Sequence, residues 1–100
     1  MKAAIFEKPG IENLEIRHNV GEPKLTDYDD VLVRVRMCGV NPIDHMVTSC
    51  AVPVRPLPHI PGCEISGTIE EIGKHVKGDL HEGDRILFTA EYLMEHVICV

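Results

Sequence analysis

The sequence predicts a mostly β domain, a barrel of about five or six short strands with one short helix. Three observations support this prediction. Apolar residues alternate over short stretches, as in strands with one buried face, and residues 31–37 are the clearest case. Glycine and proline separate these stretches, as they do at turns. No strand–helix–strand pattern occurs, so a complete doubly wound α/β domain is not expected.

The chain begins with two short predicted strands and a connection. Residues 2–6 form an apolar strand that ends before Pro9 and Gly10. Residues 13–18 alternate, which would place Leu14 and Ile16 on one face. Residues 21–30 are polar and contain a proline, so we expect a connection there.

The third predicted strand, residues 31–37, has the strongest alternation. Successive strand side chains point to opposite faces, so the odd-numbered apolar residues share one face and the arginines share the other. The apolar face would hold Val31, Val33, Val35 and Met37. On the other face, Arg34 and Arg36 would pair with Glu70 or Glu71 in solvent, each pair contributing about 0–1 kcal/mol.

A single short helix is predicted from Pro42 to about Ser49. Proline suits the first helical turn because its φ is already fixed near the helical value. Asn41 is a candidate N-cap, and Asp44 would lie in the first turn, where a carboxylate is favourable. Four prolines follow within residues 52–61, which predicts an extended, ordered loop.

The rest of the chain predicts three more strands. They cover residues 65–72, 85–88 and 92–100, with Gly73 and a turn at residues 78–84 between the first two.

The composition fits one small domain and argues against several classes of protein. Of 100 residues, 44% are hydrophobic and only 4% aromatic, so the core must be mainly aliphatic. The net charge of −6 argues against nucleic acid and anionic membranes as partners. No apolar run approaches the roughly 18 residues of a spanning helix, and no signal peptide follows Lys2, so we expect a cytoplasmic protein.

The four cysteines are Cys38, Cys50, Cys63 and Cys99. No Cys-x-x-Cys occurs, which argues against a zinc ribbon or a thioredoxin-type motif. Their even number permits two disulfides, but without a secretory signal we expect free thiols. Cys63 is a weak candidate for a metal ligand or reactive thiol, and Cys38 with Cys50 is a weak candidate metal pair with His45 or His59. The alternative is that these are ordinary packed cysteines.

Several blocks of the sequence together resemble one enzyme family. The first is Cys38-Gly39-Val40-Asn41-Pro42-Ile43-Asp44, and the others are Met1-Lys2-Ala3-Ala4, Asp30-Val31-Leu32-Val33-Arg34-Val35, Pro61-Gly62-Cys63-Glu64, Gly83-Asp84-Arg85-Ile86 and Glu91-Tyr92. Their order and spacing resemble the medium-chain dehydrogenase/reductase superfamily, which includes zinc-type alcohol dehydrogenases and quinone oxidoreductases. The resemblance covers nearly the whole chain and implies the GroES-like partial β-barrel of that family's catalytic domain.

The departures from this family concern its cofactors. Family enzymes are several times longer and bind NAD(P) in a Rossmann domain with a Gly-x-Gly-x-x-Gly turn, whereas this chain contains no Gly-x-Gly. Zinc-type members carry Cys at the position of Asn41 and His at that of Cys63, so the resemblance is to the zinc-free quinone oxidoreductases. Cys38 does not match a ligand position. The chain alone is therefore expected to bind neither zinc nor NAD(P).

The resemblance marks four family-matched catalytic positions, Asn41, Asp44, Cys63 and Glu64, without a firm role for any of them. In the family, the aspartate orients groups of the active-site turn. The alternative for Asp44 is a purely structural role in the first helical turn.

The chain also lacks the family's structural-zinc lobe, because only Thr89 and Ala90 separate Phe88 from Glu91. We therefore expect residues 1–100 to form a single GroES-like domain without this lobe and without the Rossmann domain, derived either as a natural fragment or by engineered deletion. Two functions remain open. The chain is a truncated domain without catalysis of its own, or it is the substrate-binding catalytic domain of an NAD(P)-dependent oxidoreductase whose Rossmann domain is supplied elsewhere.

The apolar C-terminal stretch, residues 92–100, predicts self-association. A strand at a sheet edge presents unpaired amides and carbonyls to other chains, and exposed apolar side chains usually mark an interface. We expect a homodimer through strands near residues 85–100.

Overall fold

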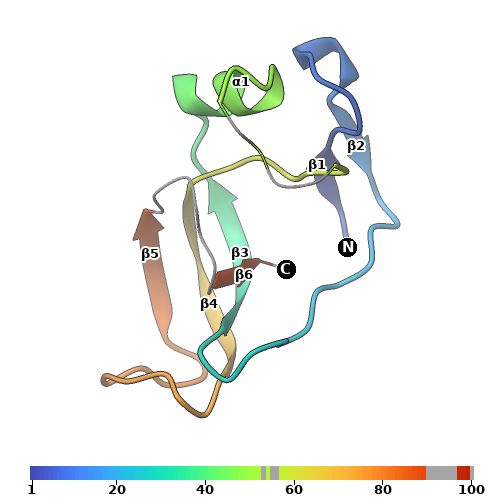
Figure 1. Cartoon of the computed structure of the whole chain (residues 1–100). Coiled ribbons are helices and arrows are strands. Elements are labelled where there is room, and N and C mark those ends of the chain that lie inside the picture. Colours follow the sequence, from blue (N-terminus) through green and yellow to red (C-terminus); the bar gives the residue numbers. More distant parts are fainter. Residues whose placement is uncertain (53, 55–56, 90–96, 100) are drawn as a thin grey trace. The chain divides into compact units, whose positions relative to one another are not determined.

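The computed structural model describes residues 1–52, 54, 57–89 and 97–99. They form the following elements: β1 (Ala3–Ile5), the 3-10 turn η1 (Ile11–Asn13), β2 (Glu15–Arg17), β3 (Val31–Cys38), α1 (Pro42–Thr48), β4 (Glu64–Ile72), β5 (Arg85–Thr89) and β6 (Val97–Cys99). Short strands with one helix confirm the predicted mostly β fold class (Figure 1). The chain divides into two compact units: Met1–Gly21 with Val40–Gly62, and Glu22–Gly39 with Cys63–Val100.

In the first unit, β1 and β2 form an antiparallel pair in which Ala4 lies opposite Ile16. The pairing continues beyond β1, because Phe6 and His59 exchange backbone hydrogen bonds of 3.0 and 2.9 Å. Phe6 is 1% exposed and meets the His59 ring edge-on, with ring centroids 5.7 Å apart. The predicted second strand is shorter than expected, because Asn13 belongs to η1.

Helix α1 begins where the sequence predicts and ends in a Schellman motif. Asn41 is its N-cap, and Val47 and Thr48 are its buried residues. At its end, the N–H of Cys50 donates to Val47 O at 3.0 Å and the N–H of Ala51 donates to Met46 O at 2.9 Å. This motif needs a left-handed residue after the cap, and Cys50 takes that role with φ 56°.

The second unit contains a sheet of strand order β5-β4-β3-β6. Strand β4 is antiparallel to β3 and β5, and β6 is parallel to β3. Four buried side chains, Val31, Val33, Ile65 and Ile69, form its core, with Val35, Ile72, Val76, Ile86 and Phe88 packed against them. Of the strand predicted over residues 92–100, only Val97–Cys99 lies within the described residues.

A bulge in β3 overturns one predicted side-chain position. Val35 lies opposite Gly67 and Met37 opposite Ser66, so two steps along β3 match one step along β4. The extra residue, Arg36, reverses the alternation. Met37 therefore leaves the face of Val31, Val33 and Val35 and is 74% exposed.

The polar connection before β3 is anchored where it leads into that strand. The carboxylate of Asp30, only 2% exposed, accepts hydrogen bonds from Thr26 Oγ1 at 3.1 Å and from the N–H of Asp27 at 3.0 Å. The N–H of Gly73 donates to Asp30 O at 2.8 Å. A Cβ on Gly73 would lie 2.2 Å from Tyr28 O, so only glycine fits this approach.

Candidate functional site

The turn that opens α1 contains two of the family-matched positions in direct contact. Asp44 Oδ2 accepts a hydrogen bond from the N–H of Asn41 at 2.7 Å, and the N–H of Asp44 donates to Asn41 O at 3.0 Å. The other carboxylate oxygen, Asp44 Oδ1, is buried and has no hydrogen-bond partner in the structure. Buried carboxylate oxygens normally have donors, so this oxygen can accept one more hydrogen bond. Both the structural role and the site role of Asp44 are thus compatible with the geometry.

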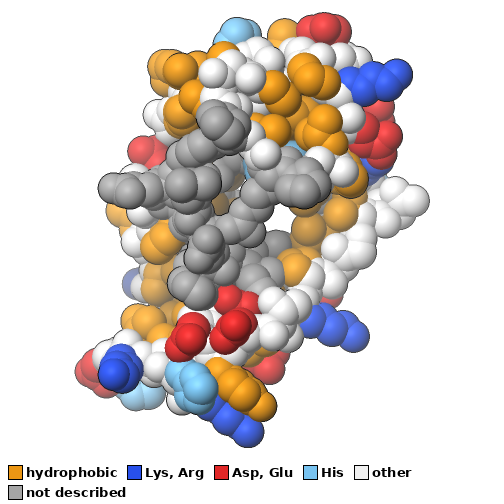
Figure 2. Space-filling model, in the orientation of Figure 1, with side chains coloured by type: hydrophobic (Ala, Val, Ile, Leu, Met, Phe, Trp, Pro, Cys, Tyr) orange, Lys and Arg blue, Asp and Glu red, His pale blue; other side chains and the backbone are white. Residues whose placement is uncertain are grey.

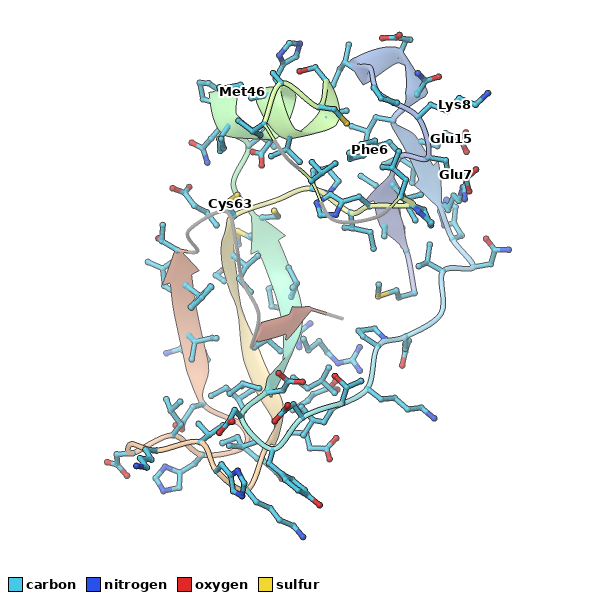
Figure 3. All side chains as sticks on the ribbon, in the orientation of Figure 1. Phe6, Glu7, Lys8, Glu15, Met46 and Cys63 are labelled. Atoms are coloured by element: carbon cyan, nitrogen blue, oxygen red, sulfur yellow. The ribbon has the colours of Figure 1, made fainter. Side chains whose placement is uncertain are left out.

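The other two family-matched positions lie in the second unit, where β4 begins. Figure 3 shows Cys63 immediately before that strand, and Glu64 is its first residue. The N–H of Gly39 donates to Glu64 O at 2.9 Å, which holds the end of β3 beside the start of β4. Cys38 lies opposite Ile65 in this pairing. Cys38 is exposed and Cys63 is half-buried.

The candidate metal ligands Cys38, Cys50, Cys63, His45 and His59 do not form a metal-holding cluster among the described residues. His59 packs against Phe6 instead. Among the described residues, no three His, Cys, Asp or Glu side chains converge to hold a metal ion. Zinc needs about three or four such ligands, so these residues do not fit the family's zinc.

The dinucleotide of the family has no matching binding motif among the described residues. A pyrophosphate is normally held by a glycine-rich turn between a strand and a helix. The sequence contains no Gly-x-Gly, and in the described part of the chain no helix connects two parallel strands. No helix among the described residues has the length and apolar character needed to cross a membrane.

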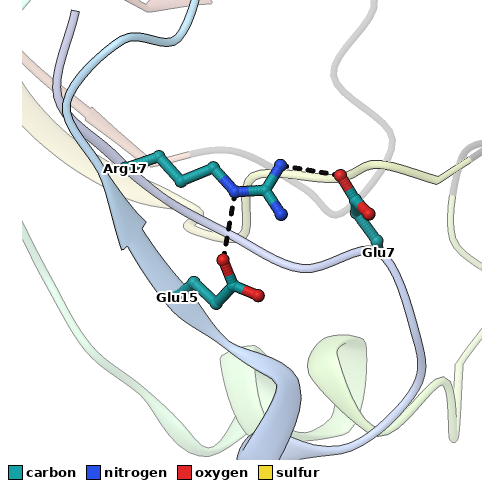
Figure 4. A network of polar contacts seen from close by, with 3 residues as sticks. All are labelled: Glu7, Glu15 and Arg17. Carbon is teal, nitrogen blue, oxygen red and sulfur yellow. Dashed lines mark hydrogen bonds and ion pairs between the residues drawn. The ribbon is translucent and has the colours of Figure 1, made fainter.

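An ion-pair network in the first unit was not predicted from the sequence. Arg17 contacts Glu7 Oε1 through NH1 at 2.6 Å and Glu15 Oε2 through Nε at 3.1 Å (Figure 4). The hydrogen bond from Arg17 lowers the pKa of Glu7, and the same carboxylate raises the pKa of Arg17. The network is exposed, so we assign it to the surface of the small sheet and not to a site. The sequence feature that could have indicated this network is the spacing of Glu15 and Arg17, because residues two apart in a strand lie on the same face.

A shallow recess of about 520 Å³ lies in the second unit beside the connection before β3. At its rim, Lys74 Nζ is 5.6 Å from the centroid of the Tyr28 ring, and the His75 ring lies 5.0 Å from Tyr28. Glu71 and Asp27 also line it, so charges of both signs meet there. Figure 2 likewise shows both acidic and basic side chains on the face in view. Nothing in this recess forms a catalytic arrangement.

Residues 27–99 match the family described as the alcohol dehydrogenase GroES-like domain. The chain is 36% identical over 90 residues to a quinone oxidoreductase of Sus scrofa, covering 89% of this chain and 26% of that protein. It is 43% identical over 90 residues to an alcohol dehydrogenase of Geobacillus stearothermophilus, covering 86% of this chain and 25% of that protein. The solved cobalt- and zinc-bound thermostable alcohol dehydrogenase of Pyrobaculum aerophilum superposes with a TM-score of 0.77 at 42% identity. The match covers 87% of this chain and 25% of that protein. The chain spans about a quarter of the length of these relatives.

Proposed function

Because the chain belongs to the alcohol dehydrogenase GroES-like domain family, we propose that it is the substrate-side domain of an NAD(P)-dependent oxidoreductase of the quinone oxidoreductase type. The chain is a shortened GroES-like domain of the kind found in alcohol dehydrogenases and quinone oxidoreductases. In this proposal it performs no turnover alone, because the hydride comes from a nicotinamide cofactor that a separate nucleotide-binding domain must hold.

The observation that carries this proposal is the contact between Asn41 and Asp44. By resemblance, the position of Asn41 holds a zinc-binding cysteine in the zinc-type enzymes. Here it holds an amide residue at the start of a helix, tied through its N–H to Asp44 Oδ2. A neutral carboxamide is not among the ligands that zinc prefers, and Cys63 alone would be one ligand. This residue chemistry supports a zinc-free quinone reductase more than a zinc-dependent alcohol dehydrogenase.

The chain's own contribution would be to bind and orient the substrate. The hydrogen bonds between Asn41 and Asp44 fix the turn, and a rigid turn can position a substrate carbonyl with little loss of entropy on binding. Asp44 Oδ1 is a buried acceptor that a donor group could still occupy. We also propose a cytoplasmic location, supported by the free thiol of Cys50.

The test compares the chain alone with the chain joined to the nucleotide-binding domain of a quinone oxidoreductase relative. Each protein is titrated with NADPH while nicotinamide fluorescence is followed, and is then assayed for NADPH-dependent reduction of a quinone. We expect no binding and no turnover from the chain alone, and quinone reduction that resists metal chelators from the joined protein. NADPH binding by the joined protein shows that its added domain has folded.

Two outcomes would contradict the proposal. Turnover or micromolar NADPH binding by the chain alone would show that it carries its own cofactor site. A joined protein that binds NADPH but reduces no quinone would favour the alternative function, an autonomous β domain without catalysis.

A further inference from the structure

Strand β5 lies at one edge of the four-stranded sheet in the described part of the chain, where its strand neighbour is β4. A strand at a sheet edge presents backbone amides and carbonyls that another strand can pair with. Proteins usually protect such edges with charged side chains or proline. The only charge in β5 is Arg85, at its first residue, and its central residue is Leu87. Within the part of the chain that the structure describes, no charge or proline protects the centre of this edge.

Leu87 also belongs to an exposed sheet face that we call the outer face. Directly paired residues of neighbouring strands point to the same side of a sheet, so the pairing defines this face. Its members on β4 and β5 are Glu64, Ser66, Thr68, Arg85, Leu87 and Thr89. Met37 joins them from β3, because the bulge at Arg36 places it opposite Ser66. Leu87 is 84% exposed and Met37 74% exposed, so both side chains are largely open to solvent.

We propose that β5 pairs antiparallel with β5 of a second copy, about a two-fold axis at Leu87. The two sheets would then continue into one another. In this register, Leu87 lies opposite the Leu87 of the second copy, and Arg85 lies opposite the Thr89 of the second copy. The contact is isologous, so it closes at a dimer and leaves neither β5 edge unpaired.

The sequence of β5 is complementary to itself in this arrangement. Its three central residues, Ile86, Leu87 and Phe88, are apolar, and they would meet the same three residues of the second copy. The two Arg85 side chains stand at opposite ends of the interface, so like charges do not face each other.

Charge complementarity also favours a second copy over an unrelated partner. Thr89 pairs with Glu64 of β4 on the outer face. Arg85 of one copy, opposite Thr89 of the other, would therefore lie two strands away from the other copy's Glu64, a backbone separation of about 10 Å. The symmetry places this pair of opposite charges near each other twice.

This proposal locates the expected homodimer at the described part of residues 85–100. It uses β5 and does not depend on residues 92–96, which lie outside the described residues. Val97–Cys99 already pair with Val31–Val33 inside the chain.

The first test measures association by sedimentation velocity from low to high micromolar concentration. We expect a species of twice the 11.2 kDa chain mass at high concentration. Leu87→Lys would place two like charges opposite each other at the axis and should weaken the dimer by at least about tenfold. Met37→Lys is the matched control, because it adds the same charge to the outer face away from the β5 edge, and it should leave association unchanged.

The second test fixes the register by cross-linking. Two cysteines replacing Leu87 would face each other across the axis at a separation that suits a disulfide. Leu87→Cys should therefore give a disulfide-linked dimer on mild oxidation, identified by peptide mapping at residue 87. Thr89→Cys, on the same face and strand, should not, because its two copies would lie at opposite ends of the pair.

A wild-type chain that stays at monomer mass throughout would overturn the proposal. So would a dimer that survives Leu87→Lys, one that Met37→Lys disrupts equally, or equal cross-linking through residues 87 and 89.

Discussion

Asp44 closes the amino end of α1 by accepting a hydrogen bond from the N–H of Asn41 at 2.7 Å. The same carboxylate leaves its other oxygen, Oδ1, buried without a partner. One side chain thus stabilises the helix and keeps a free acceptor in the turn that carries our functional proposal. These two roles have different readouts, because the cap contributes to stability and a donor bound at Oδ1 would contribute to binding.

The first prediction concerns the cap. Asp44→Ala removes the acceptor for the N–H of Asn41 and should lower the free energy of unfolding by about 1 kcal/mol. Urea denaturation followed by circular dichroism measures the change. Asp79→Ala is the matched control, because the Asp79 side chain is 99% exposed, and it should change stability by less than about 0.5 kcal/mol. If both variants lost the same free energy of unfolding, the hydrogen bond from Asn41 to Asp44 would make no specific contribution to stability.

The second prediction concerns the residue after the helix. Cys50 has φ 56°, a conformation in which a Cβ atom is strained and glycine is not. Cys50→Gly should therefore raise the free energy of unfolding by about 0.5–1 kcal/mol relative to Cys50→Ala, which also lacks the thiol but keeps the Cβ. Comparing these two variants by denaturation separates backbone strain from loss of the side chain. A glycine variant no more stable than the alanine variant would contradict backbone strain at residue 50.

Local chemistry accounts for the parts of the fold that the sequence predicts well. The start of α1 is specified by Asn41, Pro42 and Asp44, three neighbouring residues with independent reasons to favour it. Strands β3, β4 and β5 follow from alternation and from the glycines and prolines that bound them. The family resemblance, and not local chemistry, marked Asn41 and Asp44 as candidate site positions, and the hydrogen bond between them is a finding of the structure.

Features that depend on pairing between distant segments could not be predicted in the same way. The bulge at Arg36, which moves Met37 to the outer face, is set by the register of β3 against β4. The bridge between Phe6 and His59 joins two segments that share no local signal. Cys50 gives no sign of its left-handed conformation, because glycine is the usual residue there. The positions of Cys63 and Cys38 likewise depend on where β4 begins and β3 ends, and not on their spacing in the sequence.

The third prediction tests the close approach of two backbone segments in the second unit. A Cβ on Gly73 would lie 2.2 Å from Tyr28 O, and backbone cannot move away as a flexible side chain can. Gly73→Ala should therefore destabilise the protein by at least about 2 kcal/mol. Gly21→Ala is the matched control, because no atom lies within 4 Å of its added Cβ. If thermal denaturation gave both variants the same midpoint, this would contradict the close approach of Gly73 to the backbone of Tyr28.

The last prediction concerns pH and the network around Arg17. The hydrogen bond from Arg17 lowers the pKa of Glu7 in the folded chain, so its folded pKa lies below its unfolded pKa. The pair therefore stabilises the fold above the unfolded pKa of this carboxyl, and that contribution is lost as the pH falls through the folded pKa. Following the Glu7 carboxyl by NMR titration, we expect Arg17→Gln to raise its midpoint and Arg85→Gln, in the other unit, to leave it unchanged. Because the carboxyl is exposed, added salt should also raise the wild-type midpoint by screening the pair. A midpoint insensitive to both Arg17→Gln and salt would mean that the contact in Figure 4 does not persist in solution.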